Sequence, residues 1–167
     1  KNSINDHELN SLNMRMRSST DFELFSKVHN TITVSNIWRV AKLRPHCLVL
    51  MKTLAKWCCS VPVTHATQCE VCQSNFTGYQ LFHVLFHCKS VIRQQRKDIF
   101  MYQTLYELNK NLYRLLNSVC NDVFTCFLLG GVNSELQAII SFEQYPDFLI
   151  QCAEFVNSLL IILRYAL

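Results

Sequence analysis

The chain has 167 residues, of which 50% are hydrophobic and 17% are charged. This composition can supply a folded core and argues against a disordered chain. Three glycines and three prolines are few, which favours helices with short connections over a turn-rich β-sandwich or barrel. The net charge of +4 is uneven, because residues 1–60 hold nine basic and four acidic residues whereas residues 111–167 hold two and five. The basic half suits either a nucleic-acid face or ordinary solvated surface.

Residues 1–60 are expected to form an N-terminal helical segment. Residues 3–17 place apolar side chains at helical spacing, and residues 19–21 suit a helix N-cap. Residues 31–34 alternate in hydropathy and could be extended, after which residues 37–40 return to helical spacing. Pro45 fits the first turn of a largely buried helix that runs on to Trp57.

Residues 61–98 are expected to hold a zinc knuckle followed by a basic helix. A connector leads into the turn-rich insert 69–80, and from Leu81 the pattern is helical again. The run 93–98 is polar and precedes the next apolar stretch.

Residues 99–167 are expected to form a C-terminal helical segment. Residues 99–120 are amphipathic, residues 124–129 end at a Gly-Gly stop, Asn133 restarts a helix, and Pro146 precedes the last one, 147–165. Polar residues interrupt that last helix, so we expect a buried core helix and not a membrane span. The predicted fold class is therefore all-α, an irregular helical bundle with a small CCHC zinc-knuckle insert.

Nine cysteines are many for this length, but an odd number without a secretory signal does not suit a disulfide framework. Six lie among apolar neighbours and are expected to be small buried hydrophobic residues. These six are Cys47, Cys58, Cys59, Cys120, Cys126 and Cys152.

The other three cysteines fall in the pattern C-x2-C-x10-H-x4-C, formed by Cys69, Cys72, His83 and Cys88. Two cysteines separated by two residues can place both sulfurs on one ion through a tight turn, with backbone amides facing them. His83 and Cys88 are five apart, which in a regular helix would separate them around the axis, so we expect an irregular start or a long reach. His87 is the reserve ligand, and Cys88 is preferred because thiolate suits structural zinc.

A closed four-ligand zinc site leaves no position for water and predicts structure, not hydrolysis. A redox C-x2-C would need a helix beginning between the cysteines, whereas turn residues follow here. The alternative is that Cys69 and Cys72 are ordinary thiols and His83 a core histidine. The sequence has no phosphate-binding glycine loop, no nucleophile elbow and no paired carboxylates, so we expect no enzymatic activity and no small-molecule substrate.

The segment Cys69-x2-Cys72-x10-His83-Val84-Leu85-Phe86-His87-Cys88 resembles the zinc-binding segment that follows the polymerase domain of non-LTR (LINE-type) reverse transcriptases. Residues 32–40 and 128–131 are similar in style to the C-terminal tails of such elements in invertebrates. The resemblance implies metal ligation by these four residues and a role in nucleic-acid handling during target-primed reverse transcription. The acidic residue that the family often has shortly before the histidine is missing from residues 78–82.

The chain begins at Lys1 and stops after an apolar run, so we expect a piece of a longer polypeptide whose remainder is a partner. The resemblance places that parent in a nuclear or cytoplasmic ribonucleoprotein, with an RNA-directed DNA polymerase elsewhere in it. As such a tail, the chain would bind the phosphates of RNA or DNA along one helix face. The alternative is that this face is only solvated. The face would consist of Lys89, Arg93, Arg96 and Lys97.

Two other functions fit the same sequence. One is a zinc-stabilised helical module for protein interaction, with a partner docked on apolar surface that includes the last helix. The other is a retroelement relic without a selected function.

Overall fold

A computed structural model describes residues 19, 21–28, 45–60, 67–69, 71–131, 133–141 and 143–166. Helices dominate these residues, which confirms the all-α expectation. The elements are α2 (Asp21–Val28), α4 (Pro45–Ser60), β1 (Thr67–Gln68), β2 (Asn75–Phe76), α5 (Gln80–Phe82), η1 (His83–His87), α6 (Val91–Asp98), η2 (Ile99–Leu105), α7 (Tyr106–Leu108), α8 (Lys110–Ser118), α9 (Asn121–Leu128), α10 (Ser134–Ile139) and α11 (Tyr145–Ala166), where η marks π-helical turns. The elements predicted at 3–17, 31–34 and 37–40 lie outside the described residues.

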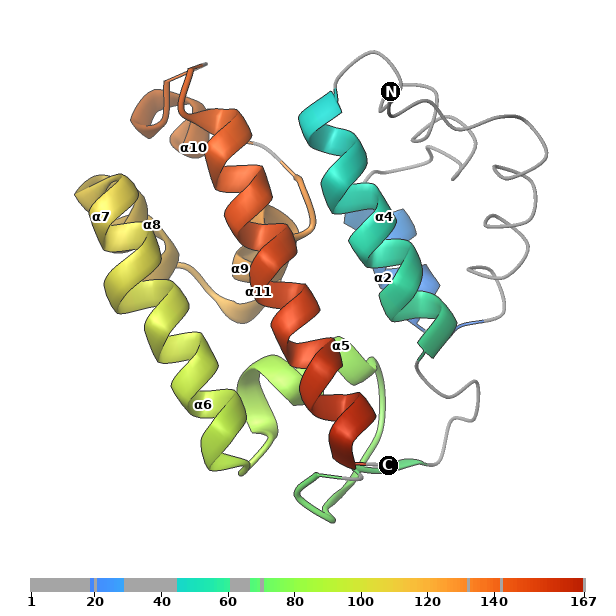
Figure 1. The fold of residues 1–167 in the computed structure, drawn as a ribbon. Coiled ribbons are helices and arrows are strands. Elements are labelled where there is room, and N and C mark those ends of the chain that lie inside the picture. The colour runs from blue at the N-terminus through green and yellow to red at the C-terminus, as the bar shows by residue number, and fades with distance from the viewer. Residues whose placement is uncertain are drawn as a thin grey trace, which may run out of the picture.

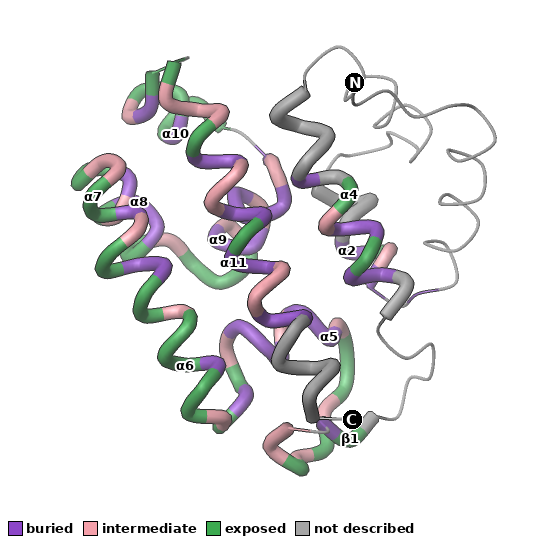
Figure 2. Tube along the Cα trace, in the orientation of Figure 1, coloured by how far each residue is buried: buried purple, intermediate pink, exposed green. Residues whose placement is uncertain are grey.

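Helix α11 lies between α4 on one side and the continuous run α6–η2–α7 on the other (Figure 1). Its inward side chains are almost fully buried, including Phe148, Cys152 and Val156. The rings of Phe100 on η2 and Phe155 on α11 stack with centroids 4.4 Å apart. Figure 2 shows buried positions where the helices face one another and exposed ones along the outer side of α6 and α7. We call α4, η2, α8, α9 and α11 the platform.

Local sequence signals explain where several helices begin and end. Helix α4 begins at Pro45, whose missing N–H costs nothing in a first turn. Gly130 adopts φ +95° just after α9, a conformation that glycine takes without steric cost. The side chain of Asn133 then accepts from the amide of Leu136 and starts α10. The amphipathic stretch 99–120 is divided at Asn109, whose extended backbone ends α7 and whose side chain caps α8.

The cysteines outside the metal pattern do not all behave as expected. Cys58 and Cys152 are buried, as predicted, and Cys126 is half-buried. Cys120 is exposed, which corrects its prediction, because it occupies the N-cap position of α9 and not the buried face of that helix. The side chains of Cys47 and Cys59 lie outside the described ones.

One apolar core joins the three segments predicted from the sequence. It contains Leu54 from the first, Leu85 from the second and Phe148 from the third. The boundary predicted between residues 98 and 99 falls inside the continuous run α6–η2. Among the described residues, no helix combines the length and hydrophobicity needed to cross a bilayer.

Candidate metal centre

A short hairpin presents the first two cysteines. Strands β1 and β2 pair antiparallel, with Thr67 opposite Phe76. The loop is closed by the amide of Cys69, which donates to the carbonyl oxygen of Ser74 at 2.8 Å, and by the amide of Gln73, which donates to the carbonyl oxygen of Cys69 at 2.8 Å. Residues 67–93 are called the knuckle below. Its tight loop brings the sulfurs of Cys69 and Cys72 within 4.8 Å of each other.

A π-helical turn presents the other two residues. His83 opens η1, and the amide of Cys88 donates to the carbonyl oxygen of His83 at 2.7 Å, five residues back. In a regular α-helix, residues five apart lie about 140° apart around the axis, whereas an i+5 bond closes one wider turn. The irregularity that the five-residue spacing demanded is therefore a π-turn at the ligands.

The four residues converge. The ligand atoms of Cys69, Cys72, His83 and Cys88 all lie within 4.8 Å of one another. The sulfurs of Cys69 and Cys88 are 4.0 Å apart, too far for a disulfide, and the sulfur of Cys72 is 3.4 Å from Nε2 of His83. Three thiols and one imidazole from two separate elements can thus hold one metal ion, and the structure brings together the set predicted from spacing.

The surroundings of the cluster fix its orientation. The rings of Phe76 and His83 stack with centroids 4.5 Å apart and planes 10° apart, which holds the imidazole edge toward the sulfurs. Cys69, His83 and Cys88 are buried, and Cys72 is half-buried. His87, the reserve ligand, is exposed and lies outside the cluster.

The two sides of the cluster differ electrostatically. Burial raises the pKa of the Cys72 thiol, but hydrogen bonds from the backbone and side chain of Ser74, the backbone of Lys89 and the ring of His83 outweigh it and lower the pKa to about 5. Burial raises the pKa of the Cys88 thiol, and hydrogen bonds from Ser90 and Arg93 only partly oppose it. The amide of Cys72 also points at the sulfur of Cys69, at 3.5 Å. Amides facing the sulfurs are what the C-x2-C turn predicts.

Arg93 corrects the predicted nucleic-acid face. Its side chain is 1% exposed, and its Nη1 donates to the sulfurs of Cys69 and Cys88, each at 3.2 Å. Ser90 accepts from the amide of Arg93 and begins α6 so that Arg93 turns back toward the cluster. A guanidinium that donates hydrogen bonds to two buried sulfurs cannot contact a phosphate in this conformation.

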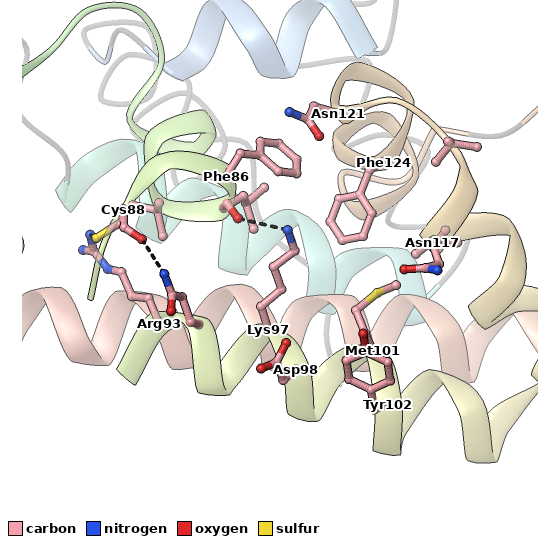
Figure 3. Close-up of a pocket in the computed structure, with 15 residues that line it drawn as sticks. Phe86, Cys88, Arg93, Lys97, Asp98, Met101, Tyr102, Asn117, Asn121 and Phe124 are labelled. Carbon is pink, nitrogen blue, oxygen red and sulfur yellow. Dashed lines mark hydrogen bonds between the residues drawn. The ribbon is translucent and has the colours of Figure 1, made fainter. Parts of the chain in front are cut away.

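The side chain of Lys97 also makes its contacts within the protein. Its Nζ donates to the carbonyl oxygen of Leu85 at 3.1 Å and lies 4.6 Å from the ring centre of Phe86. Figure 3 shows it reaching between Phe86 and Phe124 at a cavity of about 420 Å³. Burial lowers the pKa of its ammonium, opposed by the nearby charge of Asp98. Lys97 therefore joins η1 to α6.

Lys89 and Arg96, by contrast, are exposed. They lie on either side of the buried Arg93 in sequence. They are the two members of the predicted face that solvent, or a phosphate, can reach.

Asp21 is a second buried ionisable residue that matters for the site. Its carboxylate accepts from the amides of Gln80 and Leu81, at 2.7 and 2.9 Å, and from Nε1 of Trp57. It thereby caps the helix α5–η1, which carries His83. Burial raises the pKa of Asp21, although the hydrogen bonds from Trp57, Gln80 and Leu81 oppose the rise.

Sequence reasoning missed the roles of Arg93, Asp21 and Phe76. Hydropathy alone would bury Val91 and Ile92 and expose Arg93 in the first turn of α6. Instead, Val91 and Ile92 are 64% and 52% exposed and Arg93 is buried. Asp21 lies 59 residues before Gln80, too far for any local pattern to connect them. Phe76 carried a weak signal, since an aromatic residue directly after the loop can reach the metal-facing histidine.

Compared with known proteins, the chain matches no protein-family model, no curated protein and no solved structure. What it does is therefore inferred from the site and from the sequence pattern around it. The four side chains could hold one metal ion.

Proposed function

We propose that the chain is a non-catalytic, zinc-stabilised nucleic-acid-binding segment of the kind that follows the polymerase domain in LINE-type reverse transcriptases. The observation that carries the proposal is the convergence of Cys69, Cys72, His83 and Cys88 within 4.8 Å. The order and spacing of these four residues also carry the family resemblance. Binding one ion at this point would tie the β1–β2 hairpin to the helix α5–η1.

Zinc fits the donor set better than other common ions. Thiolates at about 2.3 Å and imidazole at about 2.0–2.1 Å around tetrahedral zinc give an S···S separation of about 3.8 Å and an S···N separation of about 3.6 Å. The observed separations are 4.0 Å between the sulfurs of Cys69 and Cys88 and 3.4 Å between the sulfur of Cys72 and Nε2 of His83. Calcium and magnesium prefer oxygen ligands, which the cluster does not offer.

Metal content tests the zinc assignment. Native mass spectrometry of the wild-type chain should find one zinc ion, and Cys69→Ser combined with Cys72→Ser should remove it. Cys120→Ser is the matched control, because Cys120 is an exposed cysteine outside the cluster. A wild-type chain without metal, or a double variant that keeps it, would overturn the zinc centre.

Nucleic-acid binding is the second part of the proposal and is supported by the exposed Lys89 and Arg96 beside the knuckle. Contacts from these side chains to phosphates would be sequence-tolerant and salt-dependent. The buried Arg93 and the half-buried Lys97 would position the backbone of α6 and not contact phosphate. Of the four residues predicted to form the nucleic-acid-binding face, Lys89 and Arg96 are the two that are exposed.

A salt titration with single-stranded RNA and DNA tests this part. Lys89→Gln combined with Arg96→Gln should weaken binding and reduce the slope of log K against log salt by roughly 1.4, about 0.7 for each lost phosphate contact on a single strand. The control is Lys52→Gln, an exposed lysine on α4. Absence of binding, or a slope that the double variant leaves unchanged, would rule out phosphate recognition by this surface.

A protein-interaction module is the alternative that an observation favours. Large apolar side chains are exposed along one continuous helical run. They are Val91, Ile92, Ile99, Tyr102 and Tyr106. An exposed patch involving the last helix would have favoured this alternative, and among the described residues the exposed large apolar side chains lie on α6–η2–α7. Under this alternative, Ile99→Ser would abolish the chain's activity in its parent protein, and Lys89→Gln with Arg96→Gln would not.

A further inference from the structure

We propose that Arg93 is the internal counter-ion of the metal centre and sets both its affinity for zinc and the reactivity of two of its thiolates. The inference rests on the proposed zinc centre and adds a residue that the ligand pattern does not contain. It also explains why an arginine is buried in the first turn of a helix.

The contact between Arg93 and the cluster is direct and shared. One nitrogen, Nη1, donates to the sulfurs of both Cys69 and Cys88, each at 3.2 Å, and those sulfurs are 4.0 Å apart. The guanidinium therefore spans the edge of the cluster opposite to the pair formed by Cys72 and His83. Charged N–H donors aimed at thiolates are among the strongest hydrogen bonds available to sulfur.

Charge balance shows why a cation belongs there. A divalent ion with three thiolates and one neutral imidazole leaves a net charge of −1, which is costly where Cys69, Cys88 and His83 are all buried. One guanidinium makes the assembly neutral. Arginine suits the position better than lysine, because it stays charged when buried and is more weakly hydrated.

The burial of Arg93 is a second reason to place negative charge on the two sulfurs. Its Nε and Nη2 are buried without a hydrogen-bond partner among the described residues. A cation with this environment is compensated mainly by the two sulfurs, so they must carry negative charge for the arrangement to be stable. The exposed Val91 and Ile92 beside it show that local hydropathy does not drive the burial.

Three variants of the full chain test the proposal by zinc competition against a chromophoric chelator. Arg93→Met keeps the length of the side chain and removes its charge, and should weaken zinc binding by roughly 10- to 100-fold, the effect typical of residues that hydrogen-bond to ligands. Arg93→Lys keeps a charge and should lose less. Arg114→Met, an exposed arginine on α8, should match the wild type.

Two further readouts separate charge compensation from packing. The Co²⁺-loaded Arg93→Met chain should keep the absorption of three thiolates and one imidazole, while alkylation at Cys69 and Cys88, mapped by mass spectrometry, becomes faster than in the wild type. Wild-type affinity in Arg93→Met, or equal losses in Arg93→Met and Arg93→Lys, would overturn the counter-ion role. Wild-type chain that binds no zinc would instead overturn the metal centre itself.

If Arg93→Met does not fold, an NMR experiment on the wild-type chain tests the counter-ion role. In the ¹¹³Cd-loaded, ¹⁵N-labelled protein, the Nη1 protons of Arg93 should show coupling to cadmium through the hydrogen-bonded sulfurs. A resolved Arg93 signal without that coupling would overturn the proposal.

Discussion

The knuckle and the platform bury different kinds of side chain. In the platform, the large fully buried side chains are apolar, such as Leu112, Phe127 and Phe148. In the knuckle, Arg93 and three of the four ligand residues are buried beside apolar residues such as Leu85. Apolar burial is stabilising wherever it occurs, whereas a buried charge or thiol cluster is stable only when its partners are all present. Under the proposed zinc centre, the knuckle would therefore depend on an ion in a way that the apolar platform does not.

Asp21 connects the two regions. It lies at the start of α2, receives a hydrogen bond from Trp57 on α4, and caps α5 through the amides of Gln80 and Leu81. Three donors from two elements thus hold the helix that carries His83 against the platform. In the proposed zinc centre the metal would order the knuckle internally, whereas Asp21 connects the knuckle to the platform.

Removal of the metal should have the largest effect and should be confined to the knuckle. Structural zinc contributes on the order of 10 kcal/mol or more in small modules. With a chelator, hydrogen exchange measured by mass spectrometry should lose protection at the amides of Cys69 and Cys88, which are bonded within the knuckle. Amides of α4 and α11 should stay protected. Parallel loss in all of them would show that the two regions unfold as one.

Phe148→Ala should break the platform and leave the metal ligands in place. Phe148 is 0% exposed on α11, so its truncation should cost about 3–5 kcal/mol of unfolding free energy. Denaturant titration measures the loss, and Glu154→Ala on the exposed side of the same helix is the control. At low temperature the Co²⁺ spectrum of the variant should equal that of the wild type. A changed spectrum would mean that the platform shapes the ligand geometry.

Asp21→Asn should cost roughly 1–3 kcal/mol, because an amide nitrogen replaces an acceptor that faces N–H donors. The cost should depend on pH. Since burial raises the pKa of Asp21 above 3.8 in the folded chain, its stabilising contribution is complete below pH 3.8 and is lost as pH rises through the folded pKa.

The difference in unfolding free energy between wild type and Asp21→Asn should therefore shrink as pH rises above 3.8, by about 1.4 kcal/mol for each unit of the shift. Proton release from the thiols is common to both chains and cancels in the difference. Denaturant titrations at a series of pH values measure it. A difference that grows with pH would mean that the hydrogen bonds to the carboxylate outweigh its burial.

The ligand set could be predicted because its information is local. Cys69 and Cys72 are held together by a short loop, and His83 and Cys88 by one helical turn, so spacing alone restricts where the ligands can go. Pro45, Gly130 and Asn133 likewise marked helix ends through their own backbone chemistry. The wider turn at η1 was indicated only as an irregularity, since spacing shows that an α-turn fails but not which turn replaces it.

The parts that could not be predicted depend on contacts between distant residues. Nothing near Asp21 indicates that it caps a helix 59 residues later. The packing of α11 between α4 and α6 follows from matching apolar faces, and amphipathic helices offer many such matches. Arg93 was placed on a phosphate-binding face because its neighbours Arg96 and Lys97 are also basic. In the structure its guanidinium contacts Cys69, which lies 24 residues earlier in the chain.

The smallest expected effects come from two helix caps, one in each region, and they should differ in kind. Ser90 accepts one amide hydrogen bond at 3.4 Å at the start of α6, whereas Asn109 accepts two at the start of α8 and also donates to Ile139 and Gln144. Asn109→Ala should therefore cost about 2 kcal/mol and Ser90→Ala about 0.5–1 kcal/mol. Because the Ser90 cap orients Arg93, only Ser90→Ala should also weaken zinc binding. Equal zinc affinity in both variants, measured by chelator competition, would show that the ligands hold Arg93 in place without help from the cap.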